Sequence, residues 1–278
     1  MQRTLFCIGL MICTFVIPFQ LQADIVDVER QTLERYPREL IDCPTGNNCP
    51  GHGLEMRFRM FEEGGLLMAM TIGVTNQLMV YGSYGGMNVL GEGPVGWNPT
   101  PGIGFRYKIR GEDWNLPTIA VGFDNQGYGA WIDSTKRYTI KSKGFYLVAS
   151  KNHTLMNSLG LHGGINYSLE REDQDQDMGI FVGASLMIKP EASRSDFFVV
   201  HVEYDFAIND NGPRSFGVGK GYLNAGFRWA FMPELFSTRL FFEFDVRNIL
   251  KNYNLPDGKT EKELYNNRIL KVVLLEYF

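Results

Sequence analysis

Strict alternation of side-chain polarity is the feature of the sequence that most constrains the fold, and residues 240–247 show it best. Successive side chains of a β-strand point to opposite faces, so this pattern is selected only where the two faces meet different surroundings. One face of the segment suits hydrocarbon, and the other suits water or ion pairs. The apolar face carries Leu240, Phe242, Phe244 and Val246, and the other carries Phe241, Glu243, Asp245 and Arg247.

Similar alternation recurs along the chain and predicts about twelve strands. Most have the roughly 9 to 11 residues with which a tilted strand crosses a bilayer. We therefore expect an all-β protein whose residues 54–278 form a transmembrane antiparallel up-and-down β-barrel of about twelve strands, with about ten or fourteen as alternatives. The expected strands are 54–62, 65–74, 77–86, 101–111, 117–125, 143–151, 158–170, 177–188, 195–208, 221–233, 238–248 and 266–278.

The lengths of the connections favour an even number of strands. Outer-membrane barrels have short periplasmic turns and longer external loops. Every second connection is short, and most of the others are long and polar, although 63–64 and 171–176 are short where a long loop is expected. The alternative is a soluble β-sandwich or lipocalin-like barrel, whose apolar face would point inward. The long connections are 87–100, 126–142, 209–220 and 249–265.

Both ends of the chain suit the bacterial cell outer membrane. Arg3 precedes an apolar run at residues 5–19, and a small-residue cleavage site follows, so residues 1–23 are expected to be a signal peptide for export to the Gram-negative envelope. The final residues alternate as a strand and end on Phe278, although Glu276 interrupts the apolar face. The sequence has no second long apolar run, which excludes a helical membrane protein, and its net charge of -4 gives no basic face for nucleic acid.

Residues 24–53 precede the barrel and have a loose helical spacing of apolar residues. They are expected to lie in the periplasm, to plug the lumen or to dock a partner. Cys43 and Cys49 remain after cleavage, and a pair of exported cysteines favours a disulfide between them. A metal site with His52 is the alternative, but four-coordination lacks a second pair of soft ligands, so no metal or cofactor is expected.

The inward face of the expected barrel is rich in charge. Basic residues gather on the first and fourth expected strands, and acidic ones gather on the ninth and eleventh. The charges form either a polarised constriction of a diffusion channel or a neutralised network that fills a closed barrel. The candidate lumen-lining residues are Arg57, Arg59, Arg106, Lys108, Arg110, His162, Glu203, Asp205, Arg228, Glu243, Asp245 and Arg247.

Catalytic motifs are scarce. His162, Asn166 and Ser168 share the inward face of one expected strand and invite comparison with the Ser, His, Asn site of outer-membrane phospholipase. That site lies on the lipid-facing wall, whereas these residues alternate away from lipid. Neither a Gly-x-Ser-x-Gly nor a His-Glu-x-x-His motif is present, so no catalytic residue is assigned and no enzyme is expected.

Four glycine-rich strand segments carry a resemblance to a known family. They are residues 101–109, 119–129, 144–152 and 159–168, and they resemble the YjbH-type outer-membrane proteins linked to exopolysaccharide production over roughly residues 100–278. The resemblance implies a barrel associated with export or the envelope, and it transfers no catalytic residue.

These features together predict a pore or envelope component for the passage of polysaccharide or small polar solutes. A closed structural barrel without transport and an outer-membrane lipid-modifying enzyme are the alternatives. The expected partners are outer-membrane lipid, the barrel assembly machinery, and polysaccharide or envelope proteins.

Overall fold

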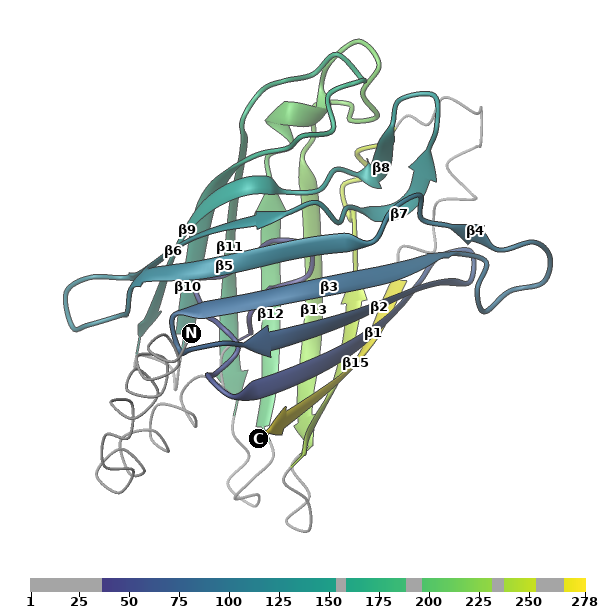
Figure 1. The fold of residues 1–278 in the computed structure, drawn as a ribbon. Coiled ribbons are helices and arrows are strands. Elements are labelled where there is room, and N and C mark those ends of the chain that lie inside the picture. The colour runs from purple at the N-terminus through teal and green to yellow at the C-terminus, as the bar shows by residue number, and fades with distance from the viewer. Residues whose placement is uncertain (1–36, 154–158, 189–196, 232–237, 254–267) are drawn as a thin grey trace, which may run out of the picture. The chain divides into compact units, whose positions relative to one another are not determined.

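The computed structural model describes residues 37–153, 159–188, 197–231, 238–253 and 268–278. The predicted signal peptide and the start of the 24–53 segment lie outside these residues. Twelve antiparallel strands form the main sheet, and a two-residue strand, β4 (Gly96–Trp97), extends the end of one of them (Figure 1). The twelve are β1 (Gly53–Phe61), β2 (Gly65–Gly73), β3 (Leu78–Met87), β5 (Gly102–Arg110), β6 (Thr118–Asp124), β9 (Gly144–His153), β10 (Leu159–Tyr167), β11 (Gly179–Ile188), β12 (Phe197–Asp205), β13 (Tyr222–Phe231), β14 (Arg239–Val246) and β15 (Arg268–Tyr277).

The sheet closes on itself. Each strand pairs with the next of the twelve along the chain, and β1 pairs with β15, so that Gly53 lies opposite Tyr277 and Met60 lies opposite Leu270. The pairing of β2 with β3 leaves no open edge in the ring. The predicted antiparallel twelve-stranded barrel is confirmed, and each predicted strand overlaps one observed strand.

The alternation of the sequence becomes an alternation between two faces. On β14, Phe241, Glu243 and Asp245 are buried inside the ring, whereas Phe244 and Val246 are exposed. Large apolar side chains form much of the outward face, which is the arrangement expected of a barrel in lipid. In the soluble alternative the apolar face would point inward, so the structure argues against that alternative.

Three connections pack together as a cap at one end of the barrel (Figure 1). The cap consists of the hairpin of β7 (Tyr128–Ile132) and β8 (Arg137–Ile140), the connection 168–178, and the connection 206–221 with its short helix η2 (Ile208–Asp210). The sequence predicts only loops in these three connections, because strands as short as β7 and β8 show little alternation of side-chain polarity. No helix among the described residues is long and apolar enough to cross a membrane.

Candidate functional site in the barrel lumen

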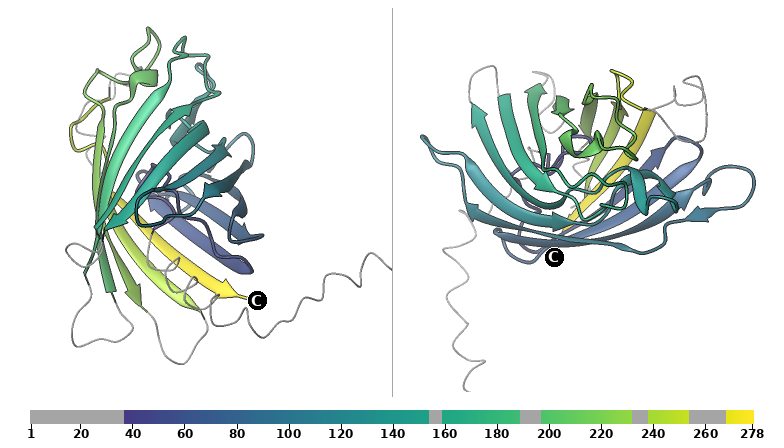
Figure 2. Two further views of the ribbon diagram at one scale, coloured as in Figure 1. Left: turned by 90° about the vertical axis from the view of Figure 1, so that its left-hand side faces the viewer. Right: turned by 90° about the horizontal axis from the view of Figure 1, so that it is seen from above.

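Residues 37–50 run through the inside of the barrel (Figure 2). They are buried except for the partly exposed Glu39, and they contact inward-facing side chains on strands from all around the ring. A segment this short can contact all of these strands only from inside the barrel. The wall side chains that it contacts are Arg59 on β1, Arg106 on β5, Ser150 on β9, Glu203 on β12 and Lys271 on β15. We call residues 37–50 the lumen segment.

Glu203 holds the middle of the lumen segment by its backbone. Its carboxylate accepts the N–H groups of Ile41 at 2.9 Å, Asp42 at 2.8 Å and Cys43 at 2.9 Å. Consecutive N–H groups that converge on one anion form a nest, which concentrates several partial positive charges at one point. The side-chain amide of Asn224 donates to the same carboxylate at 2.7 Å, so this buried carboxylate accepts four hydrogen bonds.

The acidic side chains of the lumen segment face guanidinium groups of the wall. Glu39 forms an ion pair with Arg57, and Asp42 forms one with Arg59. Arg247 lies 3.8 Å from the second oxygen of Asp42. Buried ions of opposite sign that also exchange hydrogen bonds offset much of their desolvation cost, so these pairs hold the lumen segment in a defined register.

Backbone carbonyls of the lumen segment satisfy further wall cations. Arg106 donates from Nη1 to the carbonyls of Arg38 at 2.9 Å and Asn47 at 2.6 Å. Arg59 donates to the carbonyl of Ile41 at 3.0 Å, and Lys271 donates to the same oxygen at 3.2 Å. These wall cations are thus satisfied by hydrogen bonds to the backbone of the lumen segment.

Between the lumen segment and the wall there is a cavity of about 50 Å³. Its lining includes Arg57, Arg59, Arg106, Tyr81, Tyr128 and Tyr146. Because one water needs roughly 10–15 Å³ of such volume, the cavity holds about three to five waters and has no room for a sugar ring. A solute of that size therefore does not fit in this cavity.

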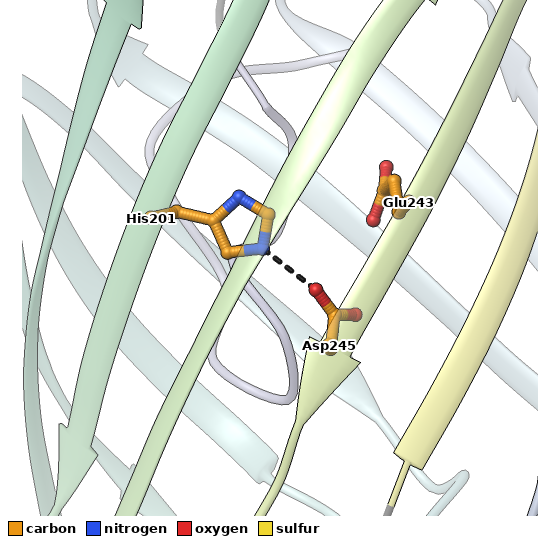
Figure 3. A group of neighbouring side chains, drawn as sticks. All are labelled: His201, Glu243 and Asp245. Carbon is orange, nitrogen blue, oxygen red and sulfur yellow. Dashed lines mark hydrogen bonds and ion pairs between the residues drawn. The ribbon is translucent and has the colours of Figure 1, made fainter.

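A second cluster of charges lies on the wall of β12, β14 and β15 (Figure 3). His201 Nε2 lies 2.8 Å from Asp245 Oδ1, and the contact passes over β13 at Gly226, where a Cβ would come within 1.9 Å of that oxygen. A side chain at this position would have to displace the Asp245 carboxylate, so glycine leaves room for the contact. Lys271 Nζ lies 3.1 Å from Asp245 and 3.3 Å from Glu243, so a lysine supplies the positive charge that a metal ion would bring.

Most of the predicted lumen-lining residues are buried in the barrel. Arg57 is partly buried, with its side chain 16% exposed. The charged side chains form ion pairs with near neighbours, as Arg228 does with Glu243 and Lys143 does with Asp205. The predicted separation into one basic and one acidic wall is therefore not observed. The ten buried residues are Arg59, Arg106, Lys108, His162, Glu203, Asp205, Arg228, Glu243, Asp245 and Arg247.

Arg110 departs from the prediction. Its side chain is 46% exposed and pairs with Asp113 in the turn after β5. A register shift between Lys108 and Arg110 marks the end of regular pairing with β6, so Arg110 lies at the rim and does not line the lumen.

The predicted disulfide between Cys43 and Cys49 is not formed, because both are buried free thiols. Cys43 packs in a cluster with Tyr146 and Phe181, whereas Cys49 belongs to the separate cluster that contains Met79. The lumen segment therefore directs the two side chains to different parts of the barrel wall. Burial raises the pKa of both thiols.

The three residues compared with a phospholipase site do not meet. His162 lies between two serines, with Nδ1 2.8 Å from Ser150 Oγ and Nε2 3.1 Å from Ser185 Oγ. Asn166 instead donates to the carbonyl of Lys143, and Ser168 Oγ accepts from the backbone of Glu170. Ser150 also accepts the N–H of Gly46, so it serves to hold the lumen segment.

Several residues that connect the lumen segment to the wall were not among the predicted lumen-lining residues. Lys271 alternates with the outward Leu270 and Val272, so its inward position could have been read from the same pattern. Arg38, Glu39 and Asp42 precede the first strand and carry no periodic signal. Their roles follow from tertiary contacts alone.

Known proteins resemble this chain only distantly. No protein-family model and no curated protein matches the chain. Among solved structures, the chain is similar to the KdgM porin, with 10% identity over 81% of this chain and 99% of that chain and a TM-score of 0.46. It is similar to the NanC porin with 10% identity, 81% and 99% coverage and a TM-score of 0.44. An outer membrane channel from Pseudomonas putida F1 matches with 10% identity, 82% and 96% coverage and a TM-score of 0.43.

The first two are porins, and the third is an outer membrane channel. At these identities and TM-scores the likeness concerns the β-barrel and carries no statement about solutes. The resemblance to YjbH-type proteins is not confirmed by these comparisons and stays a prediction.

Proposed function

We propose that the protein is an outer-membrane barrel that acts as a porin-like channel for small polar solutes and that the lumen segment holds this channel closed. The observation that carries the proposal is the occupation of the lumen by residues 37–50, a part of the chain that precedes the barrel strands.

The width of the barrel supports a channel. An eight-stranded barrel is filled by the side chains of its own wall, whereas larger barrels leave room for a ligand or a water-filled passage. Twelve strands fall between these cases, and here a separate stretch of backbone fills the space. If that stretch moved out, it would leave a passage lined by charged and hydroxyl side chains.

The chemistry of the contacts supports reversible closure. The lumen segment meets the wall mainly through ion pairs and hydrogen bonds to charged groups, such as those of Glu203 and Arg106. Each such contact contributes little net free energy when water can replace it. Displacement of the segment therefore requires no unfolding of the strands.

A saccharide is the solute that the resemblance to YjbH-type proteins favours. The second candidate function is a closed structural barrel, and the wall network of Arg228, Glu243 and Lys271 favours it, because these charges are already neutralised within the wall. Charges that are neutralised in this way stabilise the wall and are not available to bind a solute.

Conductance in planar lipid bilayers separates the two candidates. Wild-type protein should show rare openings, and a variant that lacks residues 37–48 should show frequent stepwise conductance. The folding of both proteins is checked by the difference in gel mobility between unheated and boiled samples. A folded deletion variant that never conducts would contradict the channel and favour the structural barrel. Recovery of the protein as a soluble periplasmic species would contradict the membrane location.

A further inference from the structure

The lumen segment satisfies the wall cations with carboxylates and carbonyl oxygens, as an anionic ligand would. We propose that Arg59 and Arg106, with Arg57 beside them, form a binding site for a carboxylate-bearing oligosaccharide and that the lumen segment is its built-in substitute. This inference rests on the proposed channel, since the ligand reaches the site only through the lumen.

Arg59 shows the substitution most directly. Its side chain is 2% exposed, and it donates to the carbonyl of Ile41 and pairs with the carboxylate of Asp42, both on the lumen segment. The guanidinium carbon also lies 3.8 Å from the ring centroid of Tyr128. If the segment leaves, Arg59 keeps the tyrosine ring but loses these two oxygen acceptors. Its donors would then face the passage without a protein acceptor, and charge-assisted hydrogen bonds make such a guanidinium group a favourable partner for an incoming anion.

Arg106 has the same dependence on the lumen segment. It is 4% exposed, and its Nη1 donates to the carbonyls of Arg38 and Asn47. Its Nε donates to Tyr146 Oη at 3.0 Å, a contact within the wall that fixes the direction of the guanidinium group. Departure of the segment would leave a fork of N–H donors, already oriented, that faces the passage.

When the lumen segment leaves, Glu203 loses three backbone N–H donors and Glu55 loses its ion pair with Arg38, but each carboxylate keeps a partner on the wall. Glu55 keeps Arg57 at 2.7 Å, and Glu203 keeps the amide of Asn224 at 2.7 Å. The lumen segment carries two carboxylates, Glu39 and Asp42, against one cation, Arg38, so its departure removes one net negative charge from the lumen. This imbalance sets the sign of the ligand.

The surroundings suit a sugar. Besides the arginines, the cavity is lined by Tyr81, Tyr128, Ser83 and Gln126, which offer rings together with hydroxyl and amide groups. Such side chains orient a hydroxyl-rich ligand through a few placed hydrogen bonds. Guanidinium groups bind carboxylate and phosphate alike. The acidic groups that occupy the site now are the carboxylates of Glu39 and Asp42, which favours the carboxylate class.

The test uses the full mature chain in detergent micelles and three probes: an alginate-derived hexauronate, neutral maltohexaose and tripolyphosphate. Affinity is measured by calorimetry. Displacement of the lumen segment is measured by maleimide labelling of Cys43 and Cys49, which are buried free thiols at rest. We expect the hexauronate to bind and to raise the labelling rate at both cysteines, and we expect maltohexaose to do neither.

Variants separate binding from structural support. Arg59→Gln and Arg106→Gln should each lower hexauronate affinity about tenfold, since each removes charge-assisted hydrogen bonds. The same variants should raise the labelling rate without ligand, because the lumen segment loses the same partner. A residue with a merely structural role would change the labelling but not the affinity. Arg110→Gln, at the exposed rim, is the matched control and should change neither.

Three results would overturn the inference: equal effects of hexauronate and maltohexaose, stronger binding of tripolyphosphate than of hexauronate, or unchanged hexauronate affinity in both arginine variants. Failure of the channel is a different result. If the deletion variant does not conduct while hexauronate still binds and exposes the cysteines, the binding site stands and the channel does not.

Discussion

The carboxylate of Glu203 accepts the backbone N–H of Cys43 at 2.9 Å across a separation of 160 residues in sequence. The bond ties the lumen segment to β12, and two neighbouring N–H groups converge on the same carboxylate. A single wall side chain therefore controls the position of the segment at its centre.

Replacement of this carboxylate should loosen the lumen segment without disturbing the barrel. Glu203→Gln keeps the size of the side chain but removes the charge that strengthens three hydrogen bonds, a loss of about 1–2 kcal/mol. We expect maleimide to label Cys43 about tenfold faster in the variant. Glu92→Gln changes an exposed loop residue and serves as the matched control. Equal labelling of the two variants would show that Glu203 does not restrain the segment.

A glycine at the end of β2 should be required for the lumen segment to enter the barrel. A Cβ at Gly73 would lie 1.8 Å from the carbonyl oxygen of Pro50, which is backbone and cannot rotate away. Gly73→Ala should therefore cost about 1–3 kcal/mol of stability or displace the segment. The temperature at which the folded gel band disappears measures the first effect, and labelling of Cys49 measures the second.

The control for this substitution lies on the neighbouring strand. At Gly82 the nearest atom to an added Cβ is 3.8 Å away, so Gly82→Ala should be close to neutral. A Gly73→Ala variant that behaves like Gly82→Ala would mean that the lumen segment takes another path past Pro50.

Much of the architecture could be predicted because each strand of the barrel carries its own period-two signal. The alternation of Phe242 and Glu243 places one outward and one inward whatever the rest of the chain does. The lumen segment carries no such signal, since its backbone pairs with side chains such as Glu203 and Arg106 and not with another strand. The disulfide prediction failed for the same reason: the sequence spacing of Cys43 and Cys49 does not report their directions.

Lys271 should be necessary for the wall cluster shown in Figure 3. It is fully buried between Glu243 and Asp245, so Lys271→Met leaves two buried carboxylates with one cation fewer. Breaking a buried ion pair in this way costs about 3–5 kcal/mol. We expect a lower urea midpoint for unfolding in micelles and partial recovery in a Lys271→Met, Asp245→Asn double variant.

The same experiment tests a metal site at this cluster. Because the lysine ammonium lies within 3.3 Å of both carboxylates, a chelator or added zinc should leave the wild-type midpoint unchanged. Stabilisation of the wild type by zinc would show that a metal competes successfully with Lys271.

Acid should open the cap before it affects the barrel. Asp173 in the connection 168–178 lies 2.6 Å from Arg137 Nη1 and 2.7 Å from Lys141 Nζ. Burial alone would raise the pKa of this carboxyl, but the hydrogen bonds and charges of Lys141 and Arg137 hold the pKa below its usual value of 3.8. A lowered pKa means that the ion pairs stabilise the cap fully at neutral pH and that this contribution is lost as the pH falls through the lowered pKa.

The loosening can be followed by the fluorescence of Trp131, whose ring packs 5.1 Å from that of Tyr138 in the cap. In a variant with Trp131 as its sole tryptophan, we expect a change in emission as the pH falls from 7 to about 3. Asp173→Asn should show the loosened signal already at neutral pH and a flatter acid transition, whereas Asp177→Asn, at an exposed position of the same connection, should titrate like the parent. An Asp173→Asn protein with the parental acid transition would show that Asp173 does not cause the pH response.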